Sequence, residues 1–185
     1  MAKKRGRETA RDMIFSMGAV LLTVLLILGI TYRSHSQKMP DANFAQAQSL
    51  ATSQGSWPIL VPANATDGTP AGYTLTQARF EAESYGKPGA SRWYLGYKTP
   101  ANQYVSLWQS DGNESQVIAA AANNGPCSGQ IEISGDIWKM CSQKKPLARV
   151  FYRSLGSNLA VVSGTASFAE LAKFIEGLRP VSKSS

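Results

Sequence analysis

The residue types that most often carry out catalysis are scarce in this 185-residue sequence. Its single histidine, His35, lies three positions beyond a long apolar stretch that ends at Tyr32. Acid–base and nucleophilic mechanisms that use histidine need it within hydrogen-bond reach of a partner. Phosphate-binding glycine loops, dinucleotide fingerprints and zinc-ligand spacings are also lacking. The sequence therefore gives no catalytic residue, no cofactor and no metal site, and we expect a protein that is not an enzyme.

Paired carboxylates are the remaining route to hydrolysis. Glu81 and Glu83 share one face of a predicted strand, and Asp111 and Glu114 flank a turn. The alternative interpretation of both pairs is structural, as a solvated strand edge in the first case and as a turn with a helix cap in the second. An exported hydrolase that acts on an envelope substrate with carboxylates such as Glu81 and Asp111 is the alternative function.

A cluster of aromatic residues is the most suggestive feature for binding. Two aromatic-rich runs, 92–99 and 103–109, flank the turn sequence Thr-Pro-Ala-Asn, which predicts a β-hairpin. Strand alternation places Trp93, Leu95 and Tyr97 on one face and Tyr94 and Lys98 on the other, while Val105 and Leu107 point away from Tyr104 and Trp108. One face must be core. If no helix covers the other, Tyr94, Lys98, Tyr104 and Trp108 are candidate residues for binding a glycan, a lipid or a protein; if helices cover both faces, every ring is structural.

An apolar segment precedes this domain. From Met13 to Tyr32 the sequence has 20 residues without a charge, which as a helix span roughly 30 Å, the thickness of the bilayer core. A buried globular helix would show a polar face. A cleaved signal peptide would have a shorter apolar region followed by a small-residue cleavage site. Because neither pattern is present, we expect residues 13–32 to be an uncleaved transmembrane signal anchor.

The charges on either side of this segment predict its orientation. Residues 1–12 contain five basic and two acidic residues, a net charge of +3, whereas 33–40 contain only Arg33 and Lys38 as charged residues. An excess of lysine and arginine marks the cytoplasmic side. We therefore expect a single-pass plasma-membrane protein with a basic cytoplasmic tail at 1–12 and an extracytoplasmic C-terminal part.

The expected partners follow from this topology. The tail supplies 3 of the net +7 charges of the chain, so the basic composition does not point to nucleic acid. We expect contact with the bilayer through residues 13–32, and with an envelope protein or glycan through the exported domain. The oligomeric state stays open.

Two cysteines, Cys127 and Cys141, lie 14 positions apart. They are too few to hold a metal ion without histidine nearby. In an oxidising compartment outside the cytoplasm we expect them to form a disulfide. The alternative is two separate buried thiols.

The exported part has the organisation of one domain. Residues 33–40 are polar and end in proline, as expected for a tether, and 181–185 are expected to be a disordered tail. Between them, residues 41–180 alternate between helical and strand patterns. The best-defined element is a final helix with the capping box Ser167-x-x-Glu170 and apolar residues at helical spacing up to Leu178. This order predicts an α+β domain, an antiparallel sheet covered by helices.

Five short motifs, each present once, follow one another along the chain. They are RETARDM at residues 7–13, WPILVP at 57–62, WYLGYKTP at 93–100, YVSLWQS at 104–110 and VVSGTAS at 161–167. In this order they resemble the actinobacterial membrane family catalogued as domain of unknown function 4245. The resemblance covers nearly the whole chain and implies a single-pass envelope protein without an assigned activity. We therefore expect a membrane-anchored, extracytoplasmic interaction module of the bacterial cell envelope.

Overall fold

The computed structural model describes residues 13, 15–25, 43–63, 67–82, 90–145 and 147–181. The expected cytoplasmic tail (1–12), the tether (33–40) and positions 14 and 26–32 of the expected anchor lie outside the described residues, as do residues 182–185. The chain forms two units, Met1–Met39 and Pro40–Ser185, which are described separately.

In the first unit, residues 15–25 are helical. Both hydroxyl groups in this part of the helix bond to its own backbone: Ser16 donates to the Met13 carbonyl at 3.0 Å and Thr23 to the Ala19 carbonyl at 2.9 Å. Among the described residues, no helix has both the length and the apolar character that crossing a membrane requires.

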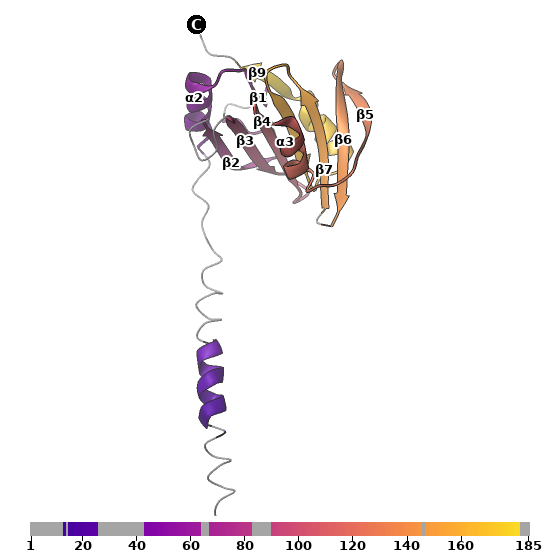
Figure 1. Ribbon diagram of the computed structural model, residues 1–185. Helices are drawn as coiled ribbons and strands as arrows, with labels where there is room; N and C mark the ends of the chain where they lie inside the picture. The colour runs from indigo at the N-terminus through magenta and orange to yellow at the C-terminus, as the bar shows by residue number, and fades with distance from the viewer. Residues whose placement is uncertain are drawn as a thin grey trace, which may run out of the picture. The chain divides into compact units, whose positions relative to one another are not determined.

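The second unit is an α+β domain built on an antiparallel sheet, as predicted (Figure 1). Seven strands form this sheet in the order β2–β3–β4–β8–β7–β6–β5, and two more form a small antiparallel sheet, β1–β9. In chain order the elements are α2 (Phe44–Gln54), β1 (Ile59–Pro62), β2 (Thr74–Glu81), β3 (Arg92–Lys98), β4 (Tyr104–Ser110), α3 (Glu114–Ala121), β5 (Cys127–Ile133), β6 (Asp136–Lys144), β7 (Leu147–Ser154), β8 (Leu159–Gly164), α4 (Phe168–Glu176) and β9 (Leu178–Val181).

Helices lie on both sides of the large sheet (Figure 1). We call the face that carries Trp93, Leu95 and Tyr97 the inner face and the opposite one the outer face. On the inner face, apolar residues of α2, β1, α4 and β9 complete the main core with these three residues. On the outer face, α3 packs through Val117 and its neighbours over β7 and β8, where a second, smaller core forms.

Each of the three helices of the domain begins at a side-chain cap, which satisfies a backbone N–H that the first turn leaves free. The side-chain Oδ1 of Asn43 accepts from the Gln46 N–H at 3.0 Å, and Oδ1 of Asn113 accepts from the Gln116 N–H at 3.1 Å. Ser167 caps α4 by accepting from the Glu170 N–H at 3.2 Å, as the capping box predicts.

The C-terminal end of the domain differs from the expectation. The final helix stops at Glu176, and Leu178 belongs to β9, where it pairs with Pro62 of β1. Val181, expected in the tail, pairs with Ile59 in the same sheet. This pairing joins residues more than a hundred positions apart in the sequence, so no local pattern indicates it. Within the motif at residues 57–62, Ile59–Pro62 form the strand β1.

Cys127 and Cys141 form a disulfide, which confirms the predicted pairing. They are directly opposite one another in the β5–β6 hairpin, with their Cα atoms 3.9 Å apart. The bond therefore closes the hairpin at the edge of the large sheet.

Candidate functional site

The predicted hairpin of aromatic residues is β3 and β4, and its two faces separate as alternation predicts. Trp93, Leu95, Tyr97, Val105 and Leu107 are fully buried in the main core. Tyr94, Tyr104 and Trp108 point to the outer face and are half-buried, and Lys98 is exposed. In the register of the two strands, Tyr94 is opposite Trp108 and Lys98 is opposite Tyr104. The four predicted binding residues therefore lie together on one face.

Strand β2 extends this outer face with residues that the sequence did not single out for binding. Arg79 is opposite Tyr94, and Glu81 is opposite Arg92 on β3. The Arg79 guanidinium carbon lies 4.8 Å from the centre of the Tyr94 ring, and that of Arg92 lies 4.6 Å from the centre of the Trp108 ring. Two of the three predicted rings, Tyr94 and Trp108, thus have an arginine over them, an attractive cation–π arrangement.

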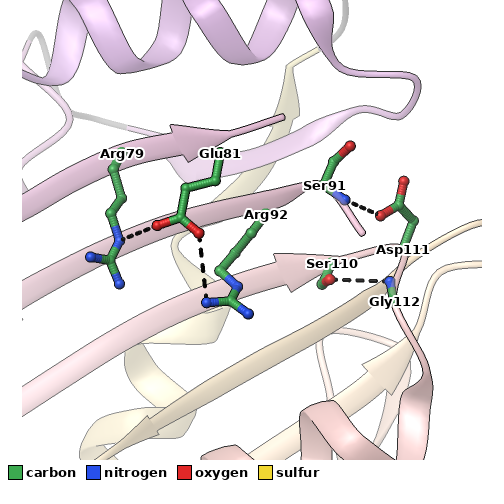
Figure 2. Close-up of polar contacts among 7 residues, drawn as sticks. All are labelled: Arg79, Glu81, Ser91, Arg92, Ser110, Asp111 and Gly112. Atoms are coloured by element: carbon green, nitrogen blue, oxygen red, sulfur yellow. Dashed lines mark hydrogen bonds and ion pairs between the residues drawn. The ribbon is translucent and has the colours of Figure 1, made fainter. Parts of the chain in front are cut away.

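One carboxylate holds both arginines in place (Figure 2). Glu81 Oε1 lies 3.4 Å from Arg79 Nε, and Glu81 Oε2 lies 3.6 Å from Arg92 Nη1. We call Arg79, Glu81 and Arg92 the outer triad. Its side chains remain 48, 34 and 34 % exposed, respectively. On this part of the outer face, the solvent-exposed groups are therefore guanidinium groups that lie over the rings of Tyr94 and Trp108.

The two tyrosines of the face touch through their hydroxyl groups, which are hydrogen-bonded to each other. Tyr104 reaches Tyr94 across Gly96, where a Cβ atom would lie only 2.5 Å from the Tyr104 hydroxyl oxygen. Burial is the main cause that raises the pKa of Tyr104, and the hydrogen bond with Tyr94 adds to it. Tyr104 is therefore a neutral phenol at physiological pH, and Gly96 is required for this contact.

The outer face is covered only in part. The described helix on this side, α3, contacts β7 and β8, and Trp108 packs against its cluster. The indole N–H of Trp108 is buried and has no hydrogen-bond partner among the described residues. Helix α3 and its cluster thus cover the Trp108 side of the face, while the outer triad stays partly exposed to solvent.

The two carboxylates of the alternative hydrolase are held by separate structural contacts (Figure 2). Both oxygens of Glu81 face arginines. Asp111 accepts from the Ser91 N–H at 2.6 Å and from the Trp57 indole N–H at 3.3 Å, so it ties the start of β3 to the segment that leads into β1. The two acids thus have different partners. Within the described ranges, no cluster of three metal-ligating side chains occurs.

A groove of about 740 Å³ lies beside α4, away from the predicted residues. Its lining is Pro62, Ala63, Pro70, Ala71, Tyr73, Pro100, Ser167, Ala169, Glu170, Lys173, Phe174 and Gly177. Burial, and then the nearby Glu170 carboxylate, raise the pKa of Tyr73. The volume suits a small ligand. Glu170 and Lys173 lie one turn apart, however, so the groove offers no net preference for either charge.

Comparison with known proteins gives the family. The sequence profile described as "Protein of unknown function (DUF4245)" matches residues 5–178, which is nearly the whole chain. The chain belongs to the DUF4245 family. No curated protein and no solved structure matches it.

Membership of the DUF4245 family carries no activity and no site residues to this chain. The function therefore has to be argued from the outer face itself. Sequence reasoning did not select Arg79 and Arg92, although the sequence contains one signal for them. Arg79 and Glu81 are two positions apart on the predicted strand before the hairpin, so they share a face, and Arg92 begins the hairpin. Only the register of β2 against β3 shows that they meet.

Proposed function

We propose that the protein is a single-pass, membrane-anchored binding module of the bacterial cell envelope, without enzymatic activity. Residues 13–32 would serve as the anchor, with residues 1–12 in the cytoplasm and the α+β domain on the other side of the plasma membrane. The basic tail and the uncharged run of 20 residues support this topology.

The described part of the proposed anchor supports it further. Its large apolar side chains, from Met13 to Leu25, are 45–68 % exposed. Exposed apolar surface of this kind needs cover by protein or lipid. Ser16 and Thr23 already bond to their own backbone, which removes the cost of placing their hydroxyl groups in hydrocarbon. The helix is thus suited to an apolar solvent along its described length.

The observation that carries the binding role is the open part of the outer face. Arginine, tyrosine and tryptophan are the residues most often found at the centre of protein interaction sites. Here Arg79 and Arg92 are stacked on Tyr94 and Trp108 and stay exposed. No corresponding observation favours the hydrolase.

Two experiments test this proposal. A reporter that is active only outside the cytoplasm, fused after the C-terminal residue, should be active; an inactive reporter would contradict the orientation. A photo-crosslinking amino acid at Lys98, on the outer face, should give a specific crosslinked partner in the native membrane at native expression. The same amino acid at Lys144, an exposed position in β6, is the control, and equal yields at both positions would refute binding through this face.

A further inference from the structure

The two arginines of the outer triad have more hydrogen-bond donors than the protein uses. A guanidinium group carries five N–H donors in a planar fork. Arg79 turns only its Nε toward Glu81, and Arg92 only its Nη1. These two contacts engage one nitrogen of each fork. Both forks can therefore donate hydrogen bonds to an external anion.

The forks are also held in fixed orientations. The guanidinium carbons lie over the rings of Tyr94 and Trp108, at 4.8 and 4.6 Å from the ring centres. Glu81 fixes one edge of each group. Because these contacts restrict the side chains before binding, an anion that binds to them costs less conformational entropy than it would at two free arginines.

The charge on this part of the face is positive. Among the outward-pointing residues of β2, β3 and β4, the basic ones are Arg79, Arg92 and Lys98, and the acidic one is Glu81. The net charge is +2. Asp111, which follows β4, is bonded to Trp57 and Ser91 instead.

Two other ligand classes fit the face less well. A neutral glycan binds to bare ring faces, but here guanidinium groups occupy the outward sides of Tyr94 and Trp108. A bilayer surface would need apolar side chains that insert. The large apolar residues exposed in the described part of the domain are Leu50, Ile131, Ile137 and Leu147, none of them on β2, β3 or β4.

We propose that the outer triad binds a linear polyanion of the envelope, in which carboxylate or phosphate groups repeat along a soluble polymer chain. This inference rests on the proposed binding role of the same face. Arg79 and Arg92 are diagonal neighbours on adjacent strands, so their Cα atoms are about 7–8 Å apart. Each fork takes one anionic group in a paired hydrogen-bond contact, and one polymer supplies both groups.

The test uses the full-length protein in detergent micelles and labelled polyphosphate or polygalacturonate as the probe, with binding followed by fluorescence anisotropy. Both polymers should bind, and more weakly as salt increases. The double variant Arg79→Gln/Arg92→Gln should lose at least about tenfold in affinity. Lys144→Gln/Lys145→Gln removes the same charge from an exposed end of β6 and its turn, and should bind like the wild type.

A variant with the opposite expected effect guards against a loss caused by unfolding. Glu81→Gln removes the carboxylate that competes for the two arginines, so polymer affinity should rise about threefold or more. Arg79→Lys/Arg92→Lys keeps the charge but not the fork, and should bind more weakly than the wild type. Unchanged affinity in this lysine variant, or equal losses in the arginine and Lys144/Lys145 variants, would overturn the assignment.

Two further outcomes separate the possible sources of failure. Binding only to vesicles that contain anionic phospholipid, with no binding to either polymer, would contradict a soluble polymer as the ligand. If neither polymer binds while crosslinking at Lys98 still captures a partner, the polyanion assignment fails alone. If crosslinking at Lys98 also gives nothing above the Lys144 control, the proposed function fails with it.

Discussion

The side chain of Gln109 takes the place of a neighbouring strand for Leu60. Its carbonyl oxygen accepts from the Leu60 N–H at 2.5 Å, and its amide donates to the Pro58 carbonyl at 3.2 Å. Gln109 lies on β4 and is fully buried. The Trp93 indole N–H donates to the Leu60 carbonyl at 2.9 Å. Through these contacts β1, and with it β9, is attached to the inner face of the large sheet, although no backbone ladder joins the two sheets.

Replacing Gln109 with leucine should therefore destabilise the domain by about 2–4 kcal/mol, because the Leu60 N–H and the Pro58 carbonyl would lose the hydrogen bonds that this buried side chain makes to them. Urea unfolding of the full-length protein in detergent, followed by tryptophan fluorescence, measures the change. Gln103→Leu, at an exposed position just before β4, is the matched control and should stay within about 0.5 kcal/mol. Equal effects of the two substitutions would show that Gln109 does not join the sheets.

The hairpin faces were predictable because one local rule, the alternation of side chains, decides them. Trp93 and Tyr94 fall on opposite faces for that reason alone. The same rule gives the wrong face in β2. A bulge between Leu75 and Gln77 shifts the register, so Leu75 and Ala78, three residues apart, both pack against the main core. Strict alternation along β2 would place Thr74 and Thr76 on the side of Ala78 instead, and nothing in the composition of the strand marks the bulge.

Of the residues on the open part of the outer face, the sequence indicated the rings but not the arginines. The rings of Tyr94 and Trp108 stand out by residue type, whereas Arg79 and Arg92 resemble ordinary solvated charges. Their role comes from pairing between strands, and pairing is a property of the folded chain. The same limitation applies to Gln109: a glutamine in an apolar run gives no sign that its partner is a backbone 49 positions earlier.

The two acidic residues considered for hydrolysis should differ in their effect on stability. Asp111→Ala removes the acceptor of the Ser91 N–H and the Trp57 indole N–H, so the free energy of unfolding should fall by about 1–3 kcal/mol. Glu81→Gln changes only exposed ion pairs and should cost less than about 1 kcal/mol. The same urea experiment measures both. A larger loss for Glu81→Gln than for Asp111→Ala would contradict these assignments.

The disulfide should contribute measurably to stability. Because it closes a loop of about 15 residues, its loss should cost about 3 kcal/mol in the chain-entropy model. Cys127→Ala/Cys141→Ala, and the wild type under reducing conditions, should lose similar amounts in urea unfolding. Protein taken from the native envelope and denatured without reductant should show no thiol that can be alkylated. Two reactive thiols in that sample would contradict both the disulfide and an oxidising location.

Buried tyrosines should make the domain sensitive to alkaline pH. Burial raises the pKa of Tyr97, with a further contribution from Asp67, and burial with the Tyr94 contact raises that of Tyr104. Above pH of about 10 the unfolded chain releases these phenolic protons while the folded domain keeps them. Alkaline pH thus favours the unfolded state. The free energy of unfolding is highest below pH of about 10 and falls above it, by about 1.4 kcal/mol per pH unit for each such tyrosine. Urea unfolding between pH 9 and about pH 11.5 measures this slope. Tyr104→Phe removes one titrating group and should make the slope shallower, and an unchanged slope in this variant would show that Tyr104 ionises alike in both states.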